Sequence, residues 1–340
     1  MEKKSMYNDT FSHIYVEEDI KEHRRVKEIL SKYSNSDIIY IKHYKDIFCR
    51  NGQNSFMQKK SKSLILAEKH GTKVYKGAIV CQNFGNENFY YTSCMMNCLY
   101  DCEYCYLQGM YSSSHVVVFV NIEDIFEEVK NMLKEHSVYL CTSYDTDMTA
   151  FESLTHYTKE WINFASNVYN NKLLIEIRTK CANENVWKEN KANENIIVAF
   201  TISPDETIQL YEHKTPSLDS RLKCINTAID NGYKVRLCFD PIIYSRDFEK
   251  KYKDFTDYVF SKVNADKIYD CSAGSFRISK EYMKIMRKNN ESSVVINYPY
   301  ENIEGYYQYP KEIQEKIKDI SLNSIGKYLP KDKINYTEEF

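Results

Sequence analysis

Apolar runs of strand length alternate with amphipathic stretches from residue 89 onward. Runs rich in β-branched and aromatic residues lie at 89–92, 116–120, 138–141, 173–178, 196–202, 235–240 and 267–271. Between several of them, apolar residues recur at helical spacing, which predicts helices at 122–133, 153–169, 217–231 and 248–263. Strand followed by helix, repeated, favours a parallel sheet with right-handed crossovers. About six such units predict an α/β fold, a partial (β/α)6 TIM-like barrel with its chemistry at the C-terminal strand ends.

The chain before residue 89 has a different pattern, typical of a small mixed α/β region. We expect a helix at 20–33, a strand at 37–41, and a hairpin in which 64–67 and 74–80 bracket Gly71. The end of the chain is rich in Tyr and Lys and is expected to pack as a short appendage. The sequence therefore divides into an N-terminal region at 1–88, the barrel at 89–300 and an appendage at 301–340.

Composition points to a globular protein of a reducing compartment. With 340 residues and 43% hydrophobic content, the chain can bury a large core. It contains no apolar run of the roughly 18 residues that a membrane helix needs, and its first residues lack a secretory apolar core. Of its 11 cysteines, four fall within twelve residues. That clustering favours a metal site in the cytoplasm over a disulfide framework.

Charge gives little sign of a partner. At a net charge of −2, binding to nucleic acid needs a local basic face. The candidate face consists of lysines that follow one another closely: Lys59, Lys60, Lys62, Lys69, Lys73 and Lys76. A solvated surface hairpin explains the same lysines equally well.

The spacing of Cys98, Cys102 and Cys105 is the most informative motif. Three thiolates on one compact loop can hold three irons of a [4Fe–4S] cluster and leave the fourth iron open. S-adenosylmethionine binds such an open iron, and reduction then releases a 5′-deoxyadenosyl radical. A structural zinc site, which wants four ligands, is the alternative. Cys94 is interpreted as a bystander, because a shifted register would need a thiol at Asp101.

Several polar residues stand where predicted strands end. Cys141 ends one strand, and its S–H bond is weak enough to give a hydrogen atom to a carbon radical; a buried structural cysteine is the alternative. Tyr104 and Tyr106, beside the cluster thiols, can recover the resulting thiyl radical, or can simply pack around the loop. Three further strand-end residues can hold S-adenosylmethionine, although each could equally cap a loop: Lys180, Thr201 and Asp240.

Taken together, these segments resemble the spore photoproduct lyase family of radical S-adenosylmethionine DNA-repair enzymes. The resemblance covers most of the chain. It rests on SHIYVEEDI near the start, CLYDCEYCYLQ around the three thiols, CTS at Cys141, TK at Lys180, HKTPSLDSR, and FDPIIY at Asp240. Many radical enzymes share CxxxCxxC, whereas CEYCYLQ together with CTS is far more specific.

The resemblance implies a substrate and a mechanism. The substrate would be 5-thyminyl-5,6-dihydrothymine, the spore photoproduct. The deoxyadenosyl radical would take hydrogen from its C6, and Cys141 would give hydrogen to the thymine allyl radical. Tyr104 and Tyr106 would return the radical toward the cofactor. Contacts to S-adenosylmethionine carry over to Ser143 and Lys180.

The resemblance also implies partners and a location. They are double-stranded DNA damaged by ultraviolet light, a one-electron reductant such as flavodoxin or ferredoxin, and the spore core within the cytoplasm. No membrane partner is implied, and we expect a monomer.

The sequence also departs from the family pattern. Thr201 replaces a serine and Asp240 a small apolar residue. Cys94 is an extra thiol, Asp145 and Asp147 follow CTS, and the segment NYPYENIEGYYQYP lacks dense Arg and Lys. A radical S-adenosylmethionine enzyme acting on a peptide or small metabolite therefore remains the alternative function.

Overall fold

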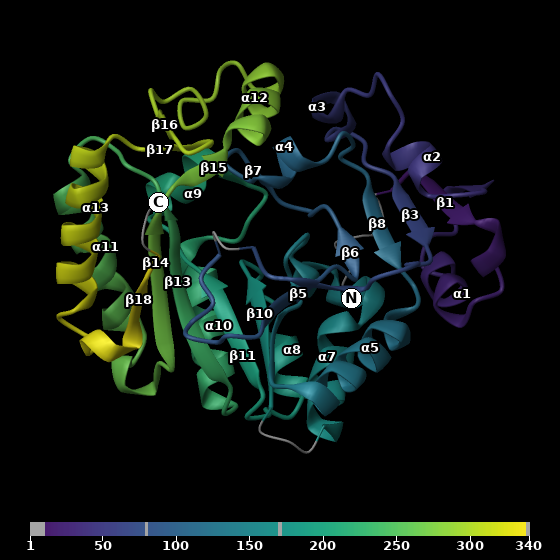
Figure 1. Ribbon diagram of the computed structural model, residues 1–340, viewed down its shortest axis with the longest axis horizontal. Helices are drawn as coiled ribbons and strands as arrows, with labels where there is room; N and C mark the ends of the chain where they lie inside the picture. The colour runs from purple at the N-terminus through teal and green to yellow at the C-terminus, as the bar shows by residue number, and fades with distance from the viewer. Residues whose placement is uncertain (1–10, 79–80, 169–171, 338–340) are drawn as a thin grey trace, which may run out of the picture.

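The main sheet is a partial barrel of eight strands (Figure 1). The computed structural model describes residues 11–78, 81–168 and 172–337. Within them the strand order is β18 (Ile334–Tyr336), β14 (Asp270–Ser275), β13 (Lys234–Ile242), β11 (Ile196–Thr201), β10 (Leu173–Thr179), β9 (Val138–Cys141), β5 (Phe89–Thr92) and β4 (Val74–Lys76). Every pair is parallel except β4 with β5. In the described residues, β4 and β18 do not pair, so the barrel is open, and the predicted fold class is confirmed.

Helices follow the strands and cover the outer face of this sheet (Figure 1). They are α5 (Ile122–Glu135), α7 (Tyr157–Asn167), α8 (Glu184–Glu189), α10 (Leu218–Asp230), α11 (Phe248–Lys262) and α13 (Lys311–Ile325). α9 (Asp205–Tyr211) follows β11 and lies near the upper ends of the strands (Figure 1). α10 shows why such a helix forms at its place in the sequence. Ser217 caps it by accepting a hydrogen bond from the Ser220 N–H at 3.3 Å, and Leu222 and Ile225 lie on its buried face.

The predicted helix at 153–169 is two helices, and residue 169 lies outside the described part of the chain. A 3₁₀ turn η2 (Met148–Phe151) leads into α6 (Glu152–Thr155), and α7 begins after His156. His156 adopts the left-handed conformation, with φ of 58°, which ends α6. The buried Glu152 carboxylate accepts hydrogen bonds from the N–H groups of Thr158 and Lys159 and so caps α7. The interruption between α6 and α7 is therefore stabilised by Glu152, a residue of α6 itself.

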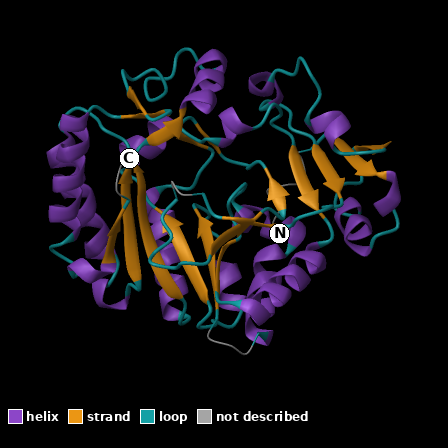
Figure 2. Cartoon of the chain, in the orientation of Figure 1, coloured by secondary structure: helices purple, strands orange, loops and turns teal. Residues whose placement is uncertain are grey.

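A second sheet of five strands lies beside the barrel, and Figure 2 shows the two as separate groups of strands. Its order is β2 (Asp37–Ile41), β1 (His13–Glu17), β3 (Leu64–Ala67), β8 (Val116–Phe119) and β6 (Met95–Met96). The predicted hairpin is wrong, because β3 pairs here with β1 and β8, whereas β4 pairs with β5 in the barrel. Strand 116–120, expected in the barrel, also belongs to this sheet. Both β3 and β8 are buried on both faces, so their sequences carry no sign of which sheet they join.

Short elements complete the fold. Toward the N-terminus these are η1 (Glu18–Ile20), α1 (Arg24–Leu30), α2 (Lys45–Phe48) and α3 (Ser55–Gln58). A small ladder pairs β7 (Asp101–Cys102) with β12 (Glu212–His213), next to α4 (Leu107–Met110). After η3 (Ala265–Lys267), a three-stranded sheet holds β15 (Arg277–Ser279), β17 (Tyr306–Gln308) and β16 (Glu301–Ile303), with α12 (Lys280–Asn289) between β15 and β16 in the chain. η4 (Lys331–Lys333) precedes β18.

The C-terminal elements pack on the barrel. α13 packs on α11, and β18 extends the barrel sheet, so residues after 301 contribute to the barrel. Among the described residues, no helix is long and apolar enough to cross a bilayer.

Candidate active site

The loop that carries Cys98, Cys102 and Cys105 is held in place by hydrogen bonds to its main chain. The Lys62 ammonium donates to the Cys98 carbonyl at 2.7 Å, and the Gln108 side-chain amide donates to the Cys102 carbonyl at 2.5 Å. Cys102 also lies in β7, opposite Glu212 of β12. These contacts fix the path of the backbone between the thiols, so the loop is shaped before any ligand binds.

The three thiols line one cavity with about 510 Å³ of empty space, part of it open to solvent. Burial raises the pKa of Cys98 to about 12 and also raises the pKa of Cys102 and Cys105. In the described chain, no three His, Cys, Asp or Glu side chains converge on one metal-ion position. The thiolates of a cubane sit on three different irons rather than on one ion, so three thiols around a shared cavity fit a [4Fe–4S] cluster.

Cys94 lies apart from this cavity. It is fully buried, its Sγ is 3.5 Å from Met148 Sδ, and burial raises its pKa to about 12. It does not line the cavity that the other three thiols share. Its surroundings are those of a core residue.

Lys180 and Tyr104 meet beside the thiol loop. The Lys180 ammonium lies 5.4 Å from the centre of the Tyr104 ring, and the Tyr104 hydroxyl donates to the Glu212 carboxylate. Arg221 also binds Glu212, with Nη2 and Oε2 2.5 Å apart. Burial lowers the pKa of Lys180, but the negative charges of Glu212, Cys102 and Cys105 together raise it by more, so the net pKa is raised. Lys180 therefore keeps its positive charge next to the loop.

The other predicted cofactor residues stand at the same end of neighbouring strands, but no described contact joins them to the thiols. Ser143 follows β9, and its buried hydroxyl has no hydrogen-bond partner in the described structure. Thr201 ends β11 and is buried, and its carbonyl accepts from Arg221 at 3.1 Å. Asp240 lies in β13, with Oδ1 3.5 Å from Arg277 Nη1. A buried hydroxyl without a partner, as in Ser143, favours a ligand that would bind it.

Cys141 ends β9 inside the barrel, and Tyr106 lies between it and the thiol loop. Cys141 is 8% exposed, and burial, with the nearby Glu176 carboxylate, raises its pKa. The pKa of Tyr106 is raised by burial and then by the charges of Asp145, Tyr144, Cys105 and Cys141. The Tyr106 hydroxyl donates to the Tyr144 carbonyl, and the two rings lie 5.8 Å apart.

Tyr144 was not predicted as a site residue, yet it connects several others. Its ring stacks on Tyr91 at 4.2 Å, and Tyr91 pairs with Cys141 between β5 and β9. Its hydroxyl lies 3.7 Å from the sulfur of Cys81. Cys81 therefore lies close to the site.

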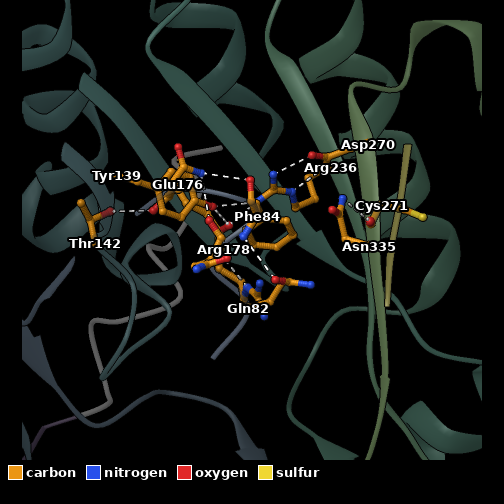
Figure 3. Close-up of polar contacts among 12 residues, drawn as sticks. Gln82, Phe84, Tyr139, Thr142, Glu176, Arg178, Arg236, Asp270, Cys271 and Asn335 are labelled. Carbon is orange, nitrogen blue, oxygen red and sulfur yellow. Dashed lines mark hydrogen bonds and ion pairs between the residues drawn. The ribbon is translucent and has the colours of Figure 1, made fainter. Parts of the chain in front are cut away.

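A buried ionic network joins side chains of neighbouring barrel strands (Figure 3). Arg236 binds Glu176 at 2.6 Å and holds both oxygens of Asp270, at 2.5 and 2.6 Å. Tyr139 donates to Glu176 at 2.5 Å, and Arg178 Nε donates to the other oxygen of Glu176 at 3.1 Å. Sequence reasoning missed this network. The available signal was charge at alternate positions of two apolar strands, Glu176 and Arg178 in one and Arg236 in the other.

The two acidic residues after the CTS segment have structural roles. Asp147 accepts hydrogen bonds from the Thr179 hydroxyl at 2.7 Å and from the Lys180 N–H at 2.7 Å, and it caps η2. Asp145 is buried and accepts a hydrogen bond from the Ser93 hydroxyl. Through these hydrogen bonds they join the ends of neighbouring strands.

A model of the family described as spore photoproduct lyase matches residues 11–338. Two curated relatives carry that name. The protein of Clostridium acetobutylicum is 23% identical over 252 residues, which cover 70% of this chain and 74% of the relative. The protein of Bacillus subtilis is 24% identical over 263 residues, which cover 70% and 73%.

Solved structures show the same fold. A spore photoproduct lyase mutant with bound AdoMet and dinucleoside spore photoproduct superimposes with a TM-score of 0.82 at 18% identity, covering 97% of this chain and 99% of that chain. A spore photoproduct lyase complexed with dinucleoside spore photoproduct gives a TM-score of 0.81, also at 18% identity, covering 96% and 98%.

Proposed function

The chain belongs to the spore photoproduct lyase family, and we propose that it is a radical S-adenosylmethionine enzyme that converts 5-thyminyl-5,6-dihydrothymine back to two thymines. Family membership supports the reaction class. The observation that carries the assignment to this site is that three thiols line one cavity while a protonated cysteine stands at a strand end inside the same barrel.

The residues proposed to hold the cofactors lie along the rim of the barrel. Cys98, Cys102 and Cys105 would ligate the cluster, with binding releasing their protons. Ser143, Lys180, Thr201 and Asp240 would contact S-adenosylmethionine, supported chiefly by the unpartnered Ser143 hydroxyl and the charged Lys180. When bound, the cluster and S-adenosylmethionine would supply a 5′-deoxyadenosyl radical, the species able to take a hydrogen atom from C6 of the lesion.

Cys141 is the proposed hydrogen-atom donor. A donor of this kind must be a thiol rather than a thiolate, and burial keeps Cys141 protonated by raising its pKa. The S–H bond breaks homolytically, the allylic carbon of the thymine radical gains the hydrogen atom, and the sulfur is left as a thiyl radical. No proton needs to enter or leave during this transfer, which suits a buried position.

Tyr106 and then Tyr104 are proposed to return the radical toward the cofactor. Tyr106 follows Cys105 in the chain and donates to the carbonyl of Tyr144, three residues after Cys141, and Tyr104 lies 5.4 Å from the Lys180 ammonium, which supports this order. A hydrogen atom moving from the Tyr106 hydroxyl to the thiyl sulfur would restore the Cys141 thiol. The Tyr104 hydroxyl is bound to Glu212, which offers an acceptor for its proton.

We propose that the enzyme meets its lesion in ultraviolet-damaged double-stranded DNA. Extruding the damaged dinucleotide costs a few kcal/mol, which phosphate contacts can offset. The lysine face suggested by the sequence is not one surface, because Lys62 and Lys69 are buried and Lys59 pairs with Asp101 at 2.6 Å. A one-electron reductant, a monomeric state and a cytoplasmic location, in the spore core, remain predictions.

An anaerobic repair assay tests the proposal. Protein reconstituted with iron and sulfide is reduced and mixed with S-adenosylmethionine and a synthetic dinucleoside lesion, and thymine is measured by chromatography. We expect thymine to form. The Cys98→Ala variant, with a disrupted cluster site, is the control and should yield none. If the cofactor is cleaved but no thymine appears, the substrate assignment is wrong and a different substrate must be sought.

A further inference from the structure

The inner face of β10 carries a row of charged residues. Glu176 and Arg178 are alternate residues of the strand, so their side chains leave it on the same face, and Lys180 directly follows the strand. This face points into the barrel, because Glu176 binds Arg236 of β13. Along the strand, Arg178 therefore lies between the buried ionic network and the rim where Lys180 meets Tyr104.

Arg178 uses only one of its five N–H donors within the described chain. Its Nε donates to Glu176 Oε1 at 3.1 Å, and neither Nη atom has a hydrogen-bond partner among the described residues. The Arg178 side chain is 31% exposed, whereas that of Glu176 is 3% exposed. Figure 3 shows the two side chains next to each other. The planar fork of Arg178 is therefore accessible and free to bind a ligand.

A purely structural role for Arg178, as a counter-charge to Glu176, fits this geometry less well. A structural arginine uses its fork, as Arg236 does with the two oxygens of Asp270 at 2.5 and 2.6 Å. Glu176 already accepts hydrogen bonds from Arg236 at 2.6 Å and from Tyr139 at 2.5 Å. Arg178 adds one longer contact, through Nε, and keeps its two terminal nitrogens available.

The strand register brings Arg178 close to the proposed hydrogen-atom donor. Glu176 pairs directly with Cys141 between β10 and β9, and Arg178 is one strand repeat, about 7 Å, farther along the same face. An arginine side chain is long enough to span that distance. Burial and Glu176 raise the pKa of Cys141, and the positive charge of Arg178 opposes part of this rise. A ligand held by the Arg178 fork can therefore reach the Cys141 thiol.

We propose that Arg178 binds the C4 carbonyl oxygen of the thymine that receives the hydrogen atom from Cys141. The inference rests on the proposed function, which supplies this substrate. In thymine the methyl carbon is attached to C5 and the carbonyl to the neighbouring C4, so both lie on one edge of the ring. The phosphodiester of a dinucleotide lies beyond N1 and the sugar, on the opposite side. Charge-assisted hydrogen bonds from Arg178 would fix the ring with its receiving carbon toward the sulfur, and Arg178 exchanges no proton.

A binding titration of Arg178→Lys tests this role, because lysine keeps the charge beside Glu176 and removes the planar fork. Iron-loaded protein with S-adenosylmethionine and no reductant is titrated calorimetrically with the synthetic dinucleoside lesion, which has no phosphate. We expect binding of the lesion to weaken about tenfold or more, and binding of S-adenosylmethionine, titrated separately, to be unchanged. The matched control is Arg25→Lys, at a buried arginine outside the barrel that two carboxylates hold. It should bind the lesion like the unmodified protein.

A second lesion, in which a phosphodiester joins the same two nucleosides, identifies the oxygen that Arg178 binds. If it is a base carbonyl, Arg178→Lys loses the same factor of affinity for both lesions. A loss confined to the phosphate-linked lesion assigns Arg178 to the phosphate and overturns the proposal. Unchanged affinity for both lesions also overturns it, and so does an equal loss of S-adenosylmethionine binding, which indicates a structural role. In these outcomes the unmodified protein still binds the lesion; if it binds neither lesion, the proposed function itself is wrong.

Discussion

Arg236 and Glu176 form a salt bridge across the interior of the barrel, with Nη1 and Oε2 2.6 Å apart and both side chains almost wholly buried. Arg236 also binds Asp270 through two hydrogen bonds, so one guanidinium balances two carboxylates that lie on either side of β13. Arg178 compensates for part of the remaining negative charge. Removing one member of such a set leaves the others buried and unpaired.

Replacing this arginine should therefore be severely destabilising. We expect Arg236→Met to lower the free energy of unfolding by about 3–5 kcal/mol, as for other broken buried ion pairs. Urea denaturation followed by circular dichroism measures the effect. The control is Lys253→Met, which removes an exposed pair with Glu249 and should change stability little. A small effect of Arg236→Met would show that water enters the network and solvates the carboxylates.

The buried thiol of Cys94 should make stability depend on alkaline pH. Burial raises its pKa to about 12 from the 9.0 of an ordinary thiol. The folded state thus holds the proton more tightly than the unfolded state, and this stability is present below pH 9 and is lost as the pH rises toward 12. The contribution lost between about pH 9 and 11 amounts to about 2 kcal/mol. In Cys94→Ala, unfolding free energies measured across this range should fall less steeply than in the unmodified protein. The exposed Cys49 provides the control: if Cys49→Ala flattens the profile equally, the assignment to Cys94 is wrong.

Removing the proposed hydrogen-atom donor should separate cofactor cleavage from repair. We expect Cys141→Ala to form 5′-deoxyadenosine while thymine recovery falls by roughly two orders of magnitude. The variant has no S–H group held in the site to give a hydrogen atom to the thymine radical. Chromatography of both products makes the comparison. The matched control is Cys238→Ala, which removes another buried barrel thiol, on β13. Normal thymine recovery from Cys141→Ala would exclude Cys141 as the donor.

The Tyr106 hydroxyl should matter for cofactor recycling more than for the first turnover. Tyr106→Phe keeps the ring and removes the hydroxyl that donates to the Tyr144 carbonyl. We expect single-turnover repair to persist while more S-adenosylmethionine is consumed per thymine formed. Tyr91→Phe, which changes the ring stacked on Tyr144 but leaves Tyr106 intact, is the control. An unchanged ratio of cofactor to product in Tyr106→Phe would remove this tyrosine from the relay.

Local signals in the sequence predicted much of the barrel. Parallel strands buried on both faces are continuous apolar runs, and β5 and β9 have the predicted bounds. The three-thiol motif was also recognisable, because its spacing lies within one loop. The sheet to which β3 and β8 belong could not be predicted, because both strands are equally apolar on both faces and their partners are distant in the chain.

The ionic network needed three-dimensional information for the same reason. Glu176 and Arg236 are 60 residues apart, and only the order of the strands brings them together. The break at His156 is likewise stabilised by a carboxylate whose role appears only after folding. Sequence periodicity identifies which residues face inward but not which of them meet.

The pairing of β7 with β12 has a consequence for how the protein matures in the cell. His213 contacts Glu103 at 2.8 Å across 110 residues of chain, and Glu212 lies opposite Cys102. On a ribosome, the thiol loop therefore emerges long before the segment that completes its shape. If the thiols hold the proposed cluster, iron delivery would follow synthesis of β12, because a nascent chain truncated before β12 carries the thiols without the strand that pairs with Cys102.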